Sequence, residues 1–164
     1  MNNDTIQKQS FEAANPEPVV RTLRLLRAGP LQFGIFTDEI AAVAAWREPT
    51  PLPQAPKSVL GVVSIEGRML TVLDLARLPA GEAPTNDVAA QHLIALRGDE
   101  QLALAVDALG ETIKVSDSEL NARNNGASVV LAVLQREGEE INILNLRELF
   151  PAAIQGRERR RRRF

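Results

Sequence analysis

The sequence predicts an all-β protein made of two five-stranded barrels related by internal duplication, with short helical turns. Short apolar stretches alternate with turn clusters along the 164 residues, which is typical of antiparallel strands. The pattern also repeats without a gap, and a repeat of about 70 residues is too small to bury a large core alone. Because closure of a sheet removes its exposed edges, five short strands in each repeat favour a small barrel.

The first ordered segment is predicted to be a hairpin. Residues 20–26 and 31–36 are apolar and flank the turn cluster Ala28-Gly29-Pro30, a composition that joins antiparallel strands. Thr37 and the aspartate after it offer N-cap oxygens, so a short helical turn is expected over residues 39–42 before the chain extends again.

Four prolines then interrupt the strand pattern, at positions 49, 51, 53 and 56. Proline lacks a backbone donor, so this segment is expected to be an ordered loop or an edge rather than a strand inside a sheet. Residues 60–65 and 68–73 flank Glu66-Gly67, which predicts a second hairpin with a tight turn. A short helical turn is expected over residues 74–78.

The second half of the chain repeats the first. Residues 60–78 lie over residues 131–149 at a constant offset of 71, with seven of nineteen positions identical. Two unrelated hairpins can look alike, but an ungapped match that includes the turn glycine and the following helix favours duplication. We expect a first barrel at about 19–79 and a second at about 88–151. An exchange of strands between the barrels is left open.

The two ends differ from this body. Residues 1–18 show no periodicity and are expected to be a flexible leader, and residues 80–87 are the best linker candidate. Residues 152–164 form a basic tail in which the last eight residues hold six arginines and one glutamate, so the rest carries a net charge of −7. An acidic body is not typical of a dedicated nucleic-acid-binding protein, although the arginines would attract any polyanion.

The sequence lacks the residues that most catalytic mechanisms and cofactor sites require. Cysteine is absent and His92 is the single histidine, which excludes thiolate nucleophiles, disulfides, cysteine-based metal sites and paired-histidine sites. Asp74 and Asp107 follow strands, where a carboxylate can bind metal, but Asp74 and its repeat partner Asn145 also fit N-caps. We expect no enzyme activity, no cofactor and no metal.

The sequence carries no expected membrane segment. Its longest apolar run covers residues 40–46, far short of the roughly 20 residues that a span needs. The polar N-terminus lacks the order of a signal peptide. We expect a cytoplasmic protein without membrane insertion.

Residues 53–75 resemble the signature of the CheW-like domain family. A proline-containing loop precedes the Gly61-Val62 hairpin, and the second strand ends at Asp74-Leu75. The family also has counterparts of the strand at residues 33–35, of the following Asp38-Glu39-Ile40 turn and of the strand at residues 104–107. The resemblance therefore covers about residues 22–150.

The resemblance implies a fold, an activity and a set of partners. The fold would be two SH3-like barrels, and the activity would be that of a noncatalytic adaptor joining the cytoplasmic tips of chemoreceptors to the regulatory domain of a chemotaxis histidine kinase. One departure is Glu66, where the family commonly has Arg, with Arg68 two positions later. The partner-binding residues implied are Gly61, Val62, Glu66, Gly67, Arg68, Val106 and Asp107.

Other functions remain open at this point. One is an SH3-like nucleic-acid-binding module that uses the arginine tail, for which counterion release predicts a steep salt dependence. Another is an adaptor of a divergent motility or type IV pilus pathway. An enzyme would need a pocket that gathers carboxylates or His92.

Overall fold

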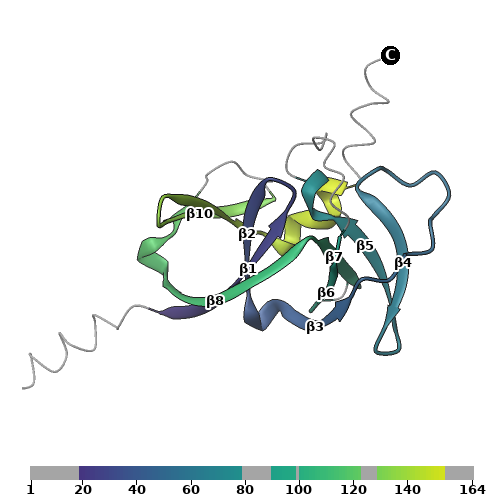
Figure 1. Ribbon diagram of the computed structural model, residues 1–164, viewed down its shortest axis with the longest axis horizontal. Coiled ribbons are helices and arrows are strands. Elements are labelled where there is room, and N and C mark those ends of the chain that lie inside the picture. Colours follow the sequence, from purple (N-terminus) through teal and green to yellow (C-terminus); the bar gives the residue numbers. More distant parts are fainter. Residues whose placement is uncertain (1–18, 79–89, 99, 123–128, 154–164) are drawn as a thin grey trace, which may run out of the picture.

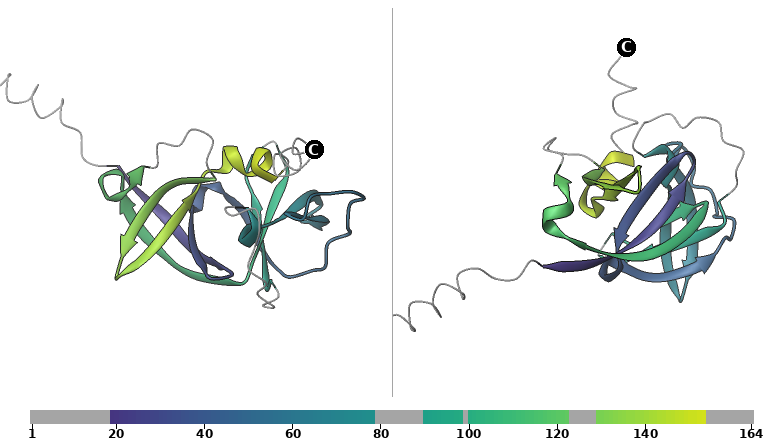
Figure 2. Two further views of the ribbon diagram at one scale, coloured as in Figure 1. Left: turned by 90° about the horizontal axis from the view of Figure 1, so that it is seen from above. Right: turned by 60° about the vertical axis from the view of Figure 1, so that its left-hand side comes forward.

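The computed structural model describes residues 19–78, 90–98, 100–122 and 129–153. These residues form two strongly curved, mostly antiparallel sheets that lie side by side (Figures 1 and 2). The predicted all-β class is confirmed, and the two sheets are the two SH3-like barrels that duplication and resemblance together predict. The expected leader at 1–18 and linker at 80–87 lie outside the described residues.

The first sheet has the strand order β8-β1-β2-β11-β10-β9. Its strands are β8 (Ala108–Ser116), β1 (Val20–Ala28), β2 (Leu31–Phe36), β11 (Glu139–Leu144), β10 (Val130–Arg136) and the two-residue β9 (Asn121–Ala122). The second sheet has the order β3-β6-β7-β5-β4. Its strands are β3 (Ile40–Ala45), β6 (His92–Leu96), β7 (Leu102–Val106), β5 (Arg68–Asp74) and β4 (Val59–Ile65).

Each sheet takes strands from both repeats. The hairpin β1–β2 joins the hairpin β10–β11 through a parallel pairing of β2 with β11, and β6–β7 joins β4–β5 through a parallel pairing of β7 with β5. Because β10 and β11 are the repeat partners of β4 and β5, the same exchange occurs twice. Neither barrel is therefore a continuous segment of the chain.

The apolar side chains of the described residues form three clusters. Two lie in the individual barrels, and the one in the second sheet is rich in alanine. The third and largest cluster draws on both repeats and holds Leu26, Phe33, Leu73, Leu104 and Leu144 among its fully buried members. Burial of a large aliphatic side chain contributes roughly 1.5–3 kcal/mol, so this shared cluster makes each barrel depend on the other.

In the part of the chain that the structure describes, four 3₁₀ turns follow strands: η1 (Thr37–Glu39), η2 (Leu75–Arg77), η3 (Asp117–Glu119) and η4 (Leu146–Glu148). The second of these confirms the helical turn expected over residues 74–78. The turn expected over residues 39–42 is wrong, because η1 ends at Glu39 and Ile40 begins β3, which pairs with β6. No side chain caps η1, so pairing with a distant strand outweighs the local capping signal.

The four-proline segment lies along the outer edge of β4. Thr50 exchanges two backbone hydrogen bonds of 2.9 Å with Val62, and this isolated bridge confirms an ordered edge. In the described parts of the chain, no helix is long and apolar enough to cross a membrane.

Candidate partner-binding surface

The hairpin β4–β5 ends in a tight turn at Glu66-Gly67, as the sequence predicts. Ile65 pairs with Arg68 across the turn, and the central residues have φ values of 50° and 78°. Positive φ at both central positions defines a type I′ turn, which matches the twist of the flanking strands and favours glycine at the second position. No atom lies within 4 Å of the place where a Cβ of Gly67 would be, so the turn points into open space.

The hairpin presents a mixed surface beside this turn. Ile65 and Leu70 are buried in the barrel core, whereas Arg68 and Met69 point outward and Met69 is 60% exposed. Arg68 forms no ion pair among the described residues, and its charge together with the exposed thioether of Met69 suits a partner with an acidic and an apolar group. Val62, further along β4, is half-buried.

Gly61 has a structural role. Its φ is +143°, and a Cβ at this position would lie 2.7 Å from the carbonyl carbon of Thr50. Only glycine allows the backbone of the proline segment to approach β4 this closely. The role of Gly61 is therefore to let the proline segment pack against β4, and not to contact a partner through a side chain.

The two residues from β7 and its end also act inside the molecule. Val106 is fully buried in the shared cluster, so its side chain is not available to a partner. Asp107 is half-buried, and its Oδ2 accepts a 2.6 Å hydrogen bond from the backbone N–H of Gly29. Its own N–H donates to the carbonyl oxygen of Arg27. Asp107 thus holds the β1–β2 turn against the other repeat.

The seven residues implied by the resemblance do not form one cluster. Gly61, Val62 and the turn residues share the β4–β5 hairpin. Along the parallel pair β5–β7, Asp74 lies opposite Ala105, so Asp107 sits near the end of β5 that is remote from Arg68. Six residues at about 3.3 Å each separate those ends by about 20 Å. The turn and Asp107 are therefore two separate surfaces.

Asp74 confirms one of the two expected N-caps. Its Oδ1 accepts a 3.2 Å hydrogen bond from the N–H of Ala76, and its Oδ2 lies 3.1 Å from Nε of Arg77. Burial raises the pKa of Asp74 and the charge of Asp107 adds to the increase, while Arg77 opposes it. The matching expectation for Asn145 is wrong, because this residue precedes η4 without a side-chain hydrogen bond.

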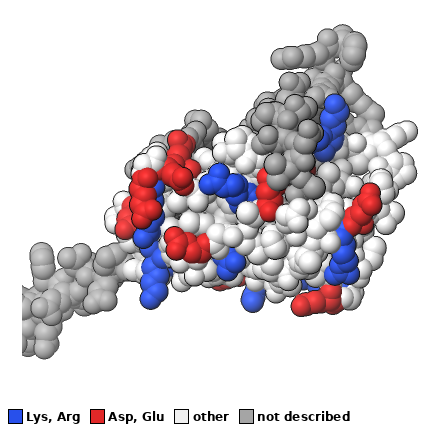
Figure 3. Space-filling view, in the orientation of Figure 1, with Lys and Arg blue, Asp and Glu red and all other residues white. Residues whose placement is uncertain are grey.

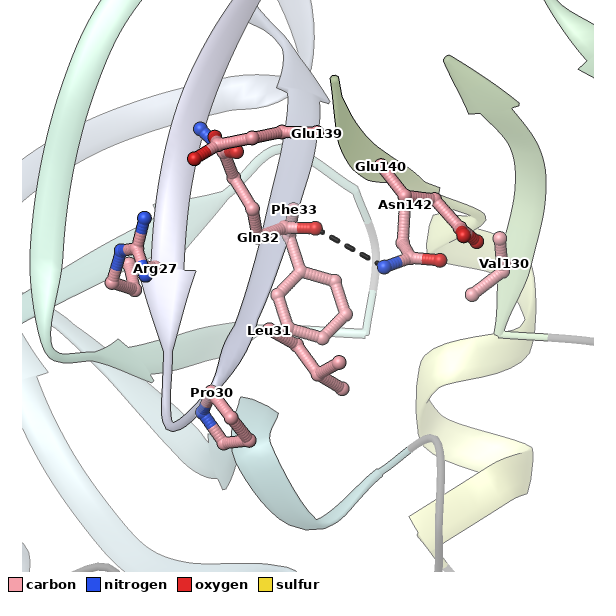
Figure 4. Close-up of a pocket in the computed structure, with 9 residues that line it drawn as sticks. All are labelled: Arg27, Pro30, Leu31, Gln32, Phe33, Val130, Glu139, Glu140 and Asn142. Carbon is pink, nitrogen blue, oxygen red and sulfur yellow. Dashed lines mark hydrogen bonds between the residues drawn. The ribbon is translucent and has the colours of Figure 1, made fainter. Parts of the chain in front are cut away.

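No pattern in the sequence predicts the pocket that lies on the first sheet. The pocket has a volume of about 390 Å³ and opens over the parallel pair β2–β11 (Figure 4). Its lining residues are Arg27, Pro30, Leu31, Gln32, Phe33, Val130, Glu139, Glu140 and Asn142. A pocket assembled by strands more than 100 residues apart has no local sequence pattern. Across its floor the side-chain nitrogen of Asn142 donates a 3.2 Å hydrogen bond to the carbonyl oxygen of Gln32.

These features define a class of protein. The molecule is a pair of strand-exchanged β-barrels with an exposed, mixed-charge hairpin, and among the described residues no group of three His, Asp or Glu side chains could hold a metal ion. Such an arrangement suits a protein-interaction module.

The chain belongs to the CheW-like domain family, whose sequence profile matches residues 23–153. Among curated relatives it is 28% identical to the Chemotaxis protein CheW of Rhizobium meliloti (strain 1021) over 137 residues, which cover 80% of this chain and 88% of the relative. It is 29% identical to Protein FrzA of Myxococcus xanthus over 136 residues, covering 79% and 84%.

A solved structure is similar as well. The scaffolding protein TtCheW from Thermoanaerobacter tengcongensis superposes with a TM-score of 0.65 at 17% sequence identity, over 77% of this chain and 90% of that one. At this identity the likeness shows the shared fold. Together with the family membership it shows that the chain has the fold of a CheW-like domain.

Proposed function

We propose that this protein is a noncatalytic cytoplasmic adaptor that couples chemoreceptors to a chemotaxis-type histidine kinase. The observation that carries the proposal is the match of nearly the whole described body to the CheW-like domain family, combined with the exposed β4–β5 hairpin. The kinase regulatory domain and the receptor tip are its two partners. Neither contact requires a cofactor, a specific nucleic acid or insertion into a membrane.

The hairpin surface supports a specific mode of binding. Arg68 and Met69 are consecutive exposed residues at the start of β5, so their side chains leave opposite faces of the hairpin, with Glu66 on the turn. An exposed ion pair contributes only about 0–1 kcal/mol, so the exposed methionine supplies apolar area while Arg68 selects an acidic partner. Glu66 at the turn then disfavours partners that are acidic at that point.

The test is a charge reversal at Arg68. Arg68→Glu changes an exposed residue and needs no backbone adjustment, so the free energy of unfolding should stay unchanged while capture of a receptor tip or kinase regulatory domain is reduced. Arg136→Glu on the hairpin β10–β11 is the matched control, because Arg136 is also exposed and the change in net charge is equal. Unreduced binding by Arg68→Glu would show that the hairpin is only a structural turn.

A further inference from the structure

The outward face of the hairpin β4–β5 consists of uncharged side chains around one methionine. The residues of the two strands that pack into the barrel core are Val63, Ile65, Leu70 and Val72. The alternate residues therefore face away from that core, and among them Ser64 pairs with Met69 and Val62 pairs with Thr71. Val62 and Thr71 are half-buried, whereas Met69 is 60% exposed. Met69 is thus the main apolar group that this face offers to a partner.

The repeat-related hairpin β10–β11 has a different face. The pair Gln135–Glu140 occupies the positions of Ser64 and Met69 at the offset of 71. Figure 3 shows acidic side chains gathered on the side of the molecule where β10 lies, whereas most of the surface on the side where β4 lies is uncharged. The same hairpin therefore forms without a methionine, and Met69 is a property of the one hairpin to which the adaptor function is assigned.

A thioether in this position is open to oxidation. The chain contains no cysteine, and its two methionines are Met69 and Met1, of which Met1 lies outside the described residues. No thiolate of the chain therefore competes with Met69 for an oxidant. Methionine sulfoxide is polar, and dedicated reductases convert it back to methionine. Oxidation would therefore change the chemistry of this face reversibly.

We propose that Met69 is a site of reversible oxidation by peroxides, and that its oxidation weakens partner binding at the hairpin β4–β5. The sulfur lone pair attacks one oxygen of hydrogen peroxide, and an S–O bond forms as the O–O bond breaks. The other oxygen takes the proton of the transferred hydroxyl and leaves as water. The sulfur loses two electrons and the peroxide gains them. The effect on binding rests on the proposed adaptor function, whereas the oxidation itself does not.

The added oxygen changes what a partner has to bury. A sulfoxide oxygen needs a hydrogen-bond donor, and the cation of Arg68 leaves the opposite face of the hairpin. We expect oxidation to weaken binding by about 5- to 100-fold, which corresponds to burial of one polar group without a hydrogen bond. Because Met69 is exposed in the free protein, oxidation should leave the free energy of unfolding unchanged.

The first experiment measures whether Met69 reacts. The chain is treated with hydrogen peroxide under native conditions, and peptide mass spectrometry follows the gain of one oxygen atom at Met69. The rate should be close to that of a methionine in a short unstructured peptide in the same solution, and methionine sulfoxide reductases should restore the original mass. A rate that reaches the peptide value only after denaturation in urea would overturn the assignment of the site.

The second experiment measures the effect on binding. Capture of a receptor tip or a kinase regulatory domain is titrated before and after peroxide treatment, and urea denaturation verifies that each sample is folded. The parent should lose affinity and regain it with the reductases. Met69→Leu cannot form a sulfoxide, so its affinity, whatever its value, should be the same before and after peroxide.

A matched control places the methionine on the other hairpin. The double variant Met69→Leu, Glu140→Met has an oxidisable thioether at the repeat-related position, and peroxide should oxidise it without changing capture. A loss of capture by this variant or by Met69→Leu, equal to that of the parent, would overturn the proposal by placing the effect elsewhere.

The two parts of the inference can fail separately. Unchanged capture by a fully oxidised parent would overturn the effect on binding. Capture of neither partner by the untreated parent would contradict the proposed adaptor function and the effect on binding with it, while the oxidation rate still decides whether Met69 is a modification site.

Discussion

Replacement of Gly61 by alanine perturbs the contact between the proline segment and β4. Its φ of +143° is closed to residues with a Cβ, and the new methyl group would lie 2.7 Å from the carbonyl carbon of Thr50. The strain contributes about 1–3 kcal/mol, and the two Thr50–Val62 hydrogen bonds contribute about 0.5–1.5 kcal/mol each if they are lost. We therefore expect Gly61→Ala to lower the free energy of unfolding by about 2–6 kcal/mol.

Gly67→Ala is the matched control for this prediction. Gly67 also has a positive φ, of +78°, but no atom would meet its Cβ, so only the left-handed strain of roughly 1–2 kcal/mol applies. Urea denaturation of both variants gives the comparison directly, because m values of about 1–3 kcal/mol/M convert a shift in midpoint into free energy. Equal shifts for the two variants would refute the argument that Thr50 is seated on Gly61.

Two further predictions concern the turn residues and Asp74. Glu66→Asn and Glu137→Asn should each raise the free energy of unfolding by up to about 1 kcal/mol, because both glutamates have φ near 50° and asparagine tolerates that conformation better. Urea denaturation measures both gains, and unequal gains would contradict the equivalence of the two turns. Burial raises the pKa of Asp74 above 3.8, so the folded state binds its proton more tightly and the contribution of this group to stability falls as pH rises above 3.8. Asp74→Asn keeps an N-cap oxygen, and its free energy of unfolding should increase relative to that of the parent as pH rises. Denaturation curves at several pH values measure this difference, and a difference that does not change with pH would contradict the reasoning.

Local signals in the sequence predicted the local structure. The turn at Glu66-Gly67 and its strands were predictable because a type I′ turn and short apolar runs are encoded within a few residues. The repeat at an offset of 71 predicted that β10–β11 would copy β4–β5, and the structure gives the two turns nearly the same φ values.

Contacts between distant residues could not be predicted in this way. The parallel pairing of β2 with β11 joins residues 110 apart, and no local pattern specifies which hairpins exchange. Asp107 anchors Gly29 across 78 residues, so its inward role was not apparent from its position after a strand. The burial of Val106 follows from the shared cluster of both repeats, which a resemblance in sequence does not reveal.

The central claim is that this chain holds a receptor and a kinase together, and co-capture measures that most directly. The tagged chain, isolated from its native cells, should retain a chemoreceptor and a histidine kinase bearing a CheW-like regulatory domain in the same complex. Arg68→Glu should lose at least one of the two partners, whereas Arg136→Glu should retain both. Recovery of neither partner with the unaltered protein would contradict the proposed adaptor function.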